Sequence, residues 1–171
     1  MKKLLFILFP ACLILSCSGT DDRVFEIDNE IDFIIPGGLN LIETHFFPVN
    51  NVPTFWQSYL DNNGFSEEQL GDILPVRASV TSRFGEDLNF INRISIWMYD
   101  TSFDQGREIF YMDPVDFGAK TEIELFSNIA ELSSLMKQSN VLLELRVTLR
   151  NVVATSTEIR LSMNFAVFPQ E

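Results

Sequence analysis

Cysteine and histidine are scarce in this sequence, and their scarcity excludes several kinds of site. The 171 residues include two cysteines and one histidine. A zinc centre built from several cysteine or histidine ligands is therefore excluded. Any Ser-His-Asp triad would have to use His45, and no serine stands in the G-x-S-x-G motif of a nucleophile elbow. A lone histidine in a predicted strand is typical of a structural or surface residue.

Positive charge is also scarce. Lys and Arg number 12 against 24 Asp and Glu, which makes the formal net charge −12. Affinity for duplex nucleic acid comes largely from Lys and Arg that neutralise phosphates, so a nucleic acid is not an expected partner. The same balance argues against electrostatic binding of the folded part to an anionic lipid surface.

Long apolar runs are limited to the N-terminus. Lys2 and Lys3 form a short basic head, and the apolar run from Leu4 to Leu15 follows it. This run is shorter than the stretch of about 20 residues that spans a bilayer. It matches the apolar centre of a secretory signal, which needs only about 7–15 residues. The sequence therefore predicts export and not a membrane-spanning helix.

The residues ILSC at 14–17, which end this run, resemble the lipobox of bacterial lipoproteins. In that family the cysteine sulfur receives a diacylglyceryl group, and a peptidase then cuts just before the cysteine. The resemblance implies a signal peptide over residues 1–16 and a lipid anchor on Cys17, with two or three acyl chains for stable attachment. The alternative is an ordinary cleaved signal with an incidental cysteine. Because Cys12 would leave with the signal, no disulfide is expected in the mature chain.

Small and acidic residues follow the cysteine directly. They resemble the short sorting signals of Bacteroidota lipoproteins, which implies attachment to the outer membrane with exposure at the cell surface. The periplasm-facing leaflet is the alternative, because a flexible charged tether is also useful without a sorting receptor. The tether residues are Ser18, Gly19, Thr20, Asp21 and Asp22.

From residue 24 onward the apolar residues recur with a period of two, which predicts strands with one buried face. Over residues 25–35, for example, Ile27, Phe33 and Ile35 share one side of the strand and four acids share the other. Residues 24–171 show no linker, so a single domain is expected. The other predicted strands cover residues 39–47, 75–84, 93–99, 108–112, 121–126, 143–150 and 159–167.

About seven or eight such strands predict an all-β fold, mainly an antiparallel β-sandwich of the immunoglobulin-like kind, with a small β-barrel as the alternative. The last two strands are predicted to pair as a hairpin across residues 151–156. Two short helical inserts are expected. One covers residues 55–62 and precedes a capping box from Ser66 to Gln69, and the other lies within residues 128–137.

Trp97 and Tyr99 are the most suggestive pair for binding. They lie two residues apart in a predicted strand, so their rings share the face opposite Ile94, Ile96 and Met98, about 7 Å from each other. Such a pair suits a flat platform for sugar rings or a peptide, with Arg93 as a polar neighbour. The alternative is that the insert around residues 55–56, or the helix near Leu132, covers both rings as a secondary core.

Residues 100–108 invite comparison with a calcium loop, because oxygen-bearing side chains alternate there. The glycine, Gly106, falls one place later than the EF-hand turn requires, and the closing bidentate Glu is missing. A solvated turn explains this composition better. The sequence therefore predicts no metal site and no cofactor.

These observations favour a non-catalytic lipoprotein of the cell envelope that binds or scaffolds a partner. The first alternative is a carbohydrate-binding module of a surface glycan-uptake system, and the second is a hydrolase. A glycan or a protein is the expected ligand, and the membrane is contacted through the N-terminal lipid. Sandwich folds host many functions, so the predicted fold does not choose among these alternatives.

Overall fold

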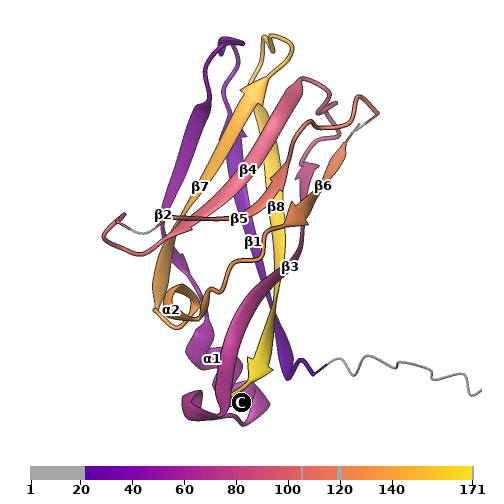
Figure 1. The fold of residues 1–171 in the computed structure, drawn as a ribbon. Coiled ribbons are helices and arrows are strands. Elements are labelled where there is room, and N and C mark those ends of the chain that lie inside the picture. The colour runs from indigo at the N-terminus through magenta and orange to yellow at the C-terminus, as the bar shows by residue number, and fades with distance from the viewer. Residues whose placement is uncertain (1–21, 105, 119–120, 171) are drawn as a thin grey trace, which may run out of the picture.

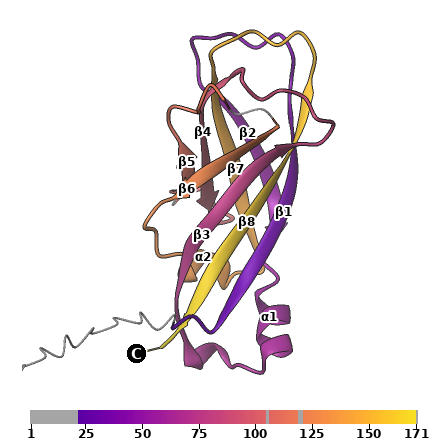
Figure 2. The same cartoon turned by 90° about the vertical axis from the view of Figure 1, so that its right-hand side faces the viewer.

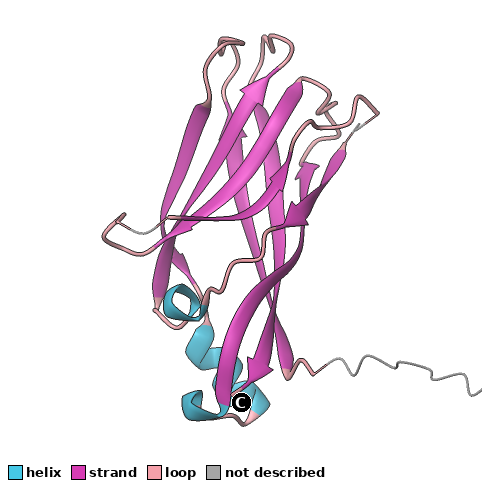
Figure 3. Cartoon of the chain, viewed as in Figure 1, coloured by secondary structure: helices cyan, strands magenta, loops and turns pink. Residues whose placement is uncertain are grey.

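A computed structural model describes residues 22–104, 106–118 and 121–170. The predicted signal peptide, Cys17 and tether residues 18–21 lie outside the described residues. Most of the described chain is β-strand, as Figure 3 shows. The strands are β1 (Phe25–Ile35), β2 (His45–Pro53), β3 (Leu70–Ser82), β4 (Ile91–Tyr99), β5 (Arg107–Met112), β6 (Glu122–Ser127), β7 (Asn140–Leu149) and β8 (Thr157–Pro169), and the helices are α1 (Trp56–Asn63), the 3-10 turn η1 (Glu67–Gln69) and α2 (Ser133–Met136).

The eight strands form one antiparallel sheet in the order β1-β8-β3-β6-β5-β4-β7-β2. The sheet folds back on itself into two layers, β1-β8-β3-β6 and β2-β7-β4-β5, which Figures 1 and 2 show from two sides. A short pairing of β5 with β6, at Phe110 and Tyr111, joins the layers. The mainly antiparallel all-β prediction is confirmed. The strand order is that of a jelly roll and not of an immunoglobulin-like sandwich.

The core lies between the two layers and follows the period-two pattern of the sequence. On β4, the predicted inward residues Ile94, Ile96 and Met98 are buried. Phe110 of one layer meets Phe165 of the other with ring centroids 5.8 Å apart, so a single core joins both layers. On β8, the buried inward residues are Ile159, Leu161, Met163, Phe165 and Val167.

The predicted hairpin between the last two strands is wrong. β8 pairs with β1 and β3, whereas β7 pairs with β2 and β4. The loop at residues 150–156 crosses from one layer to the other beside the loop at residues 36–44, where the Gly38 N–H donates to the Val153 carbonyl at 2.7 Å. A Cβ on Gly37 would lie 2.5 Å from the Ala154 oxygen, so only glycine permits this close approach. Alternation identifies the inward face of a strand but does not identify its neighbour.

Three further boundaries differ from the prediction. β2 begins at His45 and not at residue 39, because Asn40 Oδ1 accepts hydrogen bonds from the N–H groups of Ile42 and Glu43 and bends the chain. β3 begins five residues early, at Leu70, with a bulge after Pro75. The second helix is only one turn, because residues 128–132 bond to strands β5 and β3 instead. The first helix and the capping box from Ser66 to Gln69 are confirmed.

Helix α1 packs against the free edge of β1. The Tyr59 hydroxyl accepts from the Asp28 N–H at 3.0 Å and donates to the Asp28 carbonyl at 3.2 Å. Phe25 of β1 packs its ring against those of Trp56 and Tyr59, each with centroids 6.2 Å away. The helix therefore covers β1 and leaves the outer side of β4 to other residues. No helix within the described residues is long and apolar enough to cross a membrane.

Candidate functional site

The outer side of the β2-β7-β4-β5 layer carries the predicted platform residues. Arg93, Trp97 and Tyr99 alternate with the buried residues of β4 and therefore share the side that faces away from the core. The neighbouring strands add Phe46 of β2 and Arg146 of β7 to the same side, because cross-strand register places Arg146 directly between Phe46 and Ser95. We call this surface the Trp97 face.

The Arg146 guanidinium occupies the centre of the Trp97 face. Its carbon lies 3.9 Å from the centroid of the Trp97 ring and 5.3 Å from that of Phe46. These distances are typical of cation–π contacts. Trp97 is half-buried as a result, and its indole N–H donates to the Ser95 hydroxyl at 3.2 Å. Any ligand that stacks on this side of the indole would have to displace Arg146.

Tyr99 is more enclosed than Trp97, with 7% of its surface exposed. Its ring stacks on Phe103 at 4.4 Å with an interplanar angle of 2°, and on Trp97 at 6.4 Å and 26°. On Gly106 a Cβ would overlap the Tyr99 ring, so the absence of a side chain there is required. The rings of Trp97 and Tyr99 thus turn their faces toward each other and do not lie side by side in one plane.

Residues 55–56 and the helix near Leu132, which were the predicted covers for the rings of Trp97 and Tyr99, lie elsewhere. Trp56 packs against Phe25 and lies 5.9 Å from the Lys137 ammonium, next to β1. Leu132 is buried beside β3, where its N–H donates to the Ile73 carbonyl. The cover over Tyr99 is instead Phe103, from the turn that directly follows β4.

A polar network fixes Arg146 in place. Its Nε donates to Glu144 Oε1 at 2.7 Å, and its Nη2 donates to the Tyr99 hydroxyl. The hydroxyl in turn donates to Glu144 Oε1 at 3.2 Å. Burial raises the pKa of the Tyr99 hydroxyl above its ordinary value, and the charge of Glu144 raises it further, so the group stays protonated at neutral pH. Glu144 is itself buried and depends on these two donors.

A hollow of about 150 Å³ lies beside Arg146 on the Trp97 face. It is smaller than the ligand pockets of about 300–1,000 Å³ that hold drug-sized molecules, so it suits a single chemical group of a larger ligand. Arg93 stands at its edge and makes long ion pairs with Glu108, at 3.9 Å, and Asp113, at 3.5 Å. The lining residues are Thr44, Phe46, Arg93, Ser95, Trp97, Glu108, Arg146 and Thr148.

Exposed aromatic residues extend the Trp97 face to both sides. Phe46, at one edge, is 54% exposed, and Phe126 of β6, at the other, is 60% exposed. Between them the register aligns Arg146, Ser95 and Tyr111 in one row across the strands. Tyr111 also contacts the Phe126 ring at 6.0 Å. The sequence singled out only the β4 residues of the Trp97 face as candidates for binding. The alternation in residues 143–150 already indicated that Glu144, Arg146 and Thr148 point outward.

The other residues singled out in the sequence form no site. His45 is half-buried, and its Nε2 hydrogen-bonds with the Asn40 carbonyl oxygen at 2.8 Å. In the turn after β4, Asp100 accepts hydrogen bonds from the Ser102 hydroxyl and the Asp104 N–H, which is the arrangement of an ordinary polar turn. The described ranges contain no group of three or more His, Cys, Asp or Glu that could hold a metal ion.

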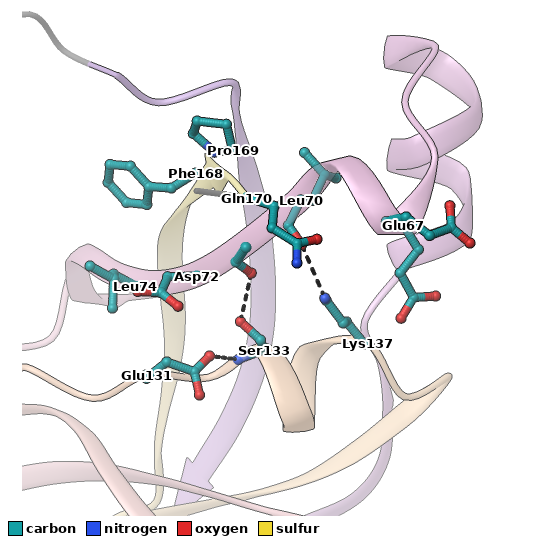
Figure 4. Close-up of a pocket in the computed structure, with 12 residues that line it drawn as sticks. Glu67, Leu70, Asp72, Leu74, Glu131, Ser133, Lys137, Phe168, Pro169 and Gln170 are labelled. Carbon is teal, nitrogen blue, oxygen red and sulfur yellow. Dashed lines mark hydrogen bonds between the residues drawn. The ribbon is translucent and has the colours of Figure 1, made fainter.

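A hollow of about 950 Å³ lies between α2 and the ends of β3 and β8 (Figure 4). Sequence reasoning did not anticipate it. Glu67, Asp72 and Glu131 make it acidic, and Lys137 Nζ reaches the Leu70 carbonyl at 3.3 Å. The Ser133 hydroxyl donates to the Gly71 carbonyl at 2.9 Å, and no histidine is among the residues that line this hollow, so Ser133 does not belong to a Ser-His pair there.

A third hollow, about 620 Å³, lies on the outer side of the β1-β8-β3-β6 layer. Asn164 is its buried polar residue, and its Nδ2 donates to Glu26 and to Asp28, each at 2.8 Å. Glu122 and Glu124 of β6 add more negative charge to the lining. The lining of this hollow is therefore acidic and contains no aromatic residue.

Exposed apolar residues also stand on the four loops at the end of the sandwich opposite α1. The loop at residues 36–44 contributes two and each of the other loops one, and backbone hydrogen bonds such as Arg150 N–H to the Phe90 carbonyl connect the loops. Phe117 is one of them, and the Arg150 guanidinium lies 4.1 Å from the centroid of its ring. These residues are Leu41, Ile42, Phe84, Phe117 and Val152.

Comparisons with known proteins leave the function open. No protein-family model matches this chain, and no curated protein matches it. The chain is similar to a solved structure of Desmodium yellow mottle tymovirus, at 12% identity over 100% of this chain and 98% of that chain, with a TM-score of 0.28. It is also similar to a structure of turnip yellow mosaic virus, at 10% identity over 86% of this chain and 95% of that chain, with a TM-score of 0.24. At these scores the similarity supports no conclusion about function.

Proposed function

We propose that this chain is a non-catalytic binding protein of the bacterial cell envelope, anchored by lipid on Cys17, whose ligand lies across the Trp97 face. The observation that carries the proposal is the row of aromatic residues and Arg146 on an outer sheet surface. A sheet side that faces water ordinarily carries polar residues. Exposed Phe46 and Phe126 therefore favour a role in contact with a partner.

The position of the two chain ends supports anchorage with the Trp97 face accessible. The start of β1 and the end of β8 lie together at the α1 end of the sandwich (Figures 1 and 2). A tether from Cys17 would hold this end nearest the membrane. The strands then lead away from the membrane, and the Trp97 face opens sideways along them.

A glycan is the ligand class that the Trp97 face fits best. The exposed ring of Phe46 provides apolar surface for the C–H groups of a sugar. The Thr148 hydroxyl and Arg93 line the hollow and can hydrogen-bond with sugar hydroxyls. This combination supports the carbohydrate-binding alternative more than a purely structural role.

The arrangement of possible catalytic groups supports a non-catalytic role. His45 bonds to a backbone carbonyl, and Ser133 donates to another. In the described part of the chain neither is part of a nucleophile–base pair, which acyl-transfer catalysis requires.

Glycan-array screening of the mature chain tests the binding site. We expect Phe46→Ala to lower the signal of the best-bound glycan at least about tenfold, because an exposed ring that stacks on sugar contributes to binding and little to folding. Phe55→Ala is the matched control, because Phe55 is 53% exposed against 54% for Phe46 and lies next to α1. Equal signals from both variants would contradict the assignment of the Trp97 face.

The lipid anchor requires a separate test. Cells supplied with a fatty-acid analogue should label the protein, and Cys17→Ala should abolish the label and leave unprocessed precursor. An equally labelled variant would disprove lipidation at Cys17. Replacement of Asp21 and Asp22 by Ala should reduce digestion by protease added to intact cells if these residues direct surface exposure.

A further inference from the structure

We propose that the hollow of the Trp97 face binds a carboxylate group of an acidic glycan, with Arg146 as the residue that recognises it. This inference rests on the proposed function and names the class of ligand. It is carried by the position of Arg146, which is held from several sides, lines the hollow and uses only two of its five N–H donors.

Arg146 is fixed before any ligand arrives. Trp97 and Phe46 contact its guanidinium, at 3.9 and 5.3 Å from their ring centroids. Glu144 accepts from Nε, and the Tyr99 hydroxyl accepts from Nη2. A guanidinium held in this way loses little conformational freedom on binding, so less of the interaction energy is spent on ordering the side chain.

The same contacts leave part of the guanidinium available. Arginine has five N–H donors, and Glu144 and Tyr99 use one each. Within residues 22–104, 106–118 and 121–170, no acceptor is found for the two N–H groups of Nη1 or for the second N–H of Nη2. The side chain is 26% exposed and lines the hollow. One N–H from each terminal nitrogen forms the parallel fork that binds the two oxygens of a carboxylate.

The surroundings of the hollow fit the rest of a sugar acid. Thr148 offers a hydroxyl, and the ring of Phe46 offers an apolar surface. Arg93 is half-exposed, and its ion pairs with Glu108 and Asp113 are longer than hydrogen bonds, so it can turn toward an added carboxylate. The chain has a net charge of −12, so the recognition has to be local: it depends on these two arginines and not on a long-range positive field.

Paired ligands test the inference with the lipid-free mature chain. The probes are uronate oligosaccharides, such as oligogalacturonate and oligomers that contain glucuronate or mannuronate, each compared with its own methyl ester by calorimetric titration. We expect the free acid to bind at least about tenfold more tightly than the ester, because a charge-assisted hydrogen bond is lost on esterification. Equal affinity of acid and ester would overturn the inference.

Variants of Arg146 connect the preference with this residue. Arg146→Lys keeps the charge but not the fork, and we expect it to reduce the acid-to-ester ratio to near one. If Arg146→Lys does not fold, the double variant Glu144→Gln with Arg146→Gln replaces it. This variant removes both charges together, so no buried carboxylate is left without a partner. Arg160→Gln is the control, because Arg160 lies on the outer side of the other layer and is paired with Asp32. An unchanged ratio in a folded Arg146 variant would refute the role of Arg146.

The outcomes separate this inference from the proposed function. Neutral glycans that bind as well as uronates, and lose binding in Phe46→Ala, would overturn the inference and leave the proposed function standing. Binding of polyglutamate without binding of any uronate would overturn the glycan assignment. Absence of binding to every glycan on the array would overturn both.

Discussion

The two outer surfaces of the sandwich differ in how their arginines are used. On the β1-β8-β3-β6 layer, Arg160 donates from Nε to Asp32 at 2.8 Å and from Nη1 to Glu30 at 3.1 Å. On the Trp97 face, Arg146 and Tyr99 both donate to one carboxylate, that of Glu144. The guanidinium of Arg146 also makes cation–π contacts with two aromatic rings. The first arginine donates three hydrogen bonds to two exposed acids, whereas the second donates two, one to a buried acid and one to a tyrosine.

This difference indicates distinct roles for the two outer surfaces, although inward and outward side chains alternate along the strands of both layers in the same way. The acids of β1 lie on an edge strand, where charge discourages pairing with other chains. Their arginine neutralises part of that charge and needs no ligand. The Trp97 face has aromatic residues in the same outward positions, which is unfavourable in water unless something covers them.

The largest effect is expected in the core that both layers share. Phe165 is buried and meets Phe110 across the layers. We expect Phe165→Ala to lower the free energy of unfolding by about 3–5 kcal/mol, because a large cavity remains. Urea unfolding measures this cost. A loss below about 1 kcal/mol would show that Phe165 faces solvent and not the core. The side of β8 described above as outer would then be the inner one, and the comparison of the two outer surfaces would not hold.

The next effect concerns the buried carboxylate of the Trp97 face. Glu144→Ala removes the acceptor of Arg146 and Tyr99. We expect a loss of about 1–3 kcal/mol in the free energy of unfolding, because two donors in a partly buried network lose their partner. Glu30→Ala on the other layer is the comparison, and it should cost less than about 1 kcal/mol because Glu30 is exposed. Similar costs for the two variants would remove the distinction between the surfaces.

A smaller effect, about 0.5 kcal/mol, is expected for the exposed ion pair of Asp32 with Arg160. The hydrogen bond from Arg160 holds the pKa of the Asp32 carboxyl below its ordinary value. A depressed folded-state pKa stabilises the protein above the unfolded pKa of about 3.9, and this stability is lost as the pH falls through the folded value.

Asp32→Asn should therefore lower the free energy of unfolding at neutral pH, and its difference from the parent protein should shrink as the pH falls below about 4. Urea unfolding across this pH range, at low and high salt, measures the effect. A difference that persists in acid would mean that Asp32 acts through something other than its charge.

The smallest effect on folding is expected at the exposed end of the aromatic row. Phe126→Ala should lower the free energy of unfolding by less than about 0.5 kcal/mol, measured by urea unfolding, because most of this ring faces water. The same substitution should weaken any glycan that spans the whole row from Phe46. A large loss of stability would indicate that the row is a structural cluster, and the contrast with the acidic layer would lose its functional meaning.

The candidate site was predictable only along its own strand. Arg93, Trp97 and Tyr99 alternate within a few residues, so the sequence placed them on one side of β4. Phe103, which covers Tyr99, also lies close in sequence, but its position depends on how the turn after β4 folds back. The contact between Arg146 and Trp97 joins strands that are far apart in the sequence, and no local pattern encodes it.

The sequence by itself determined which side of β1, β3, β4, β7 and β8 is buried, where α1 lies and that the fold is all-β, because side-chain alternation and helical spacing are local properties of the chain. Tertiary structure alone decided that β7 and β8 lie in different layers and that Arg146 stands over Trp97. Neighbouring strands are selected by how loops cross between layers and by how the core packs, and these depend on the whole chain at once.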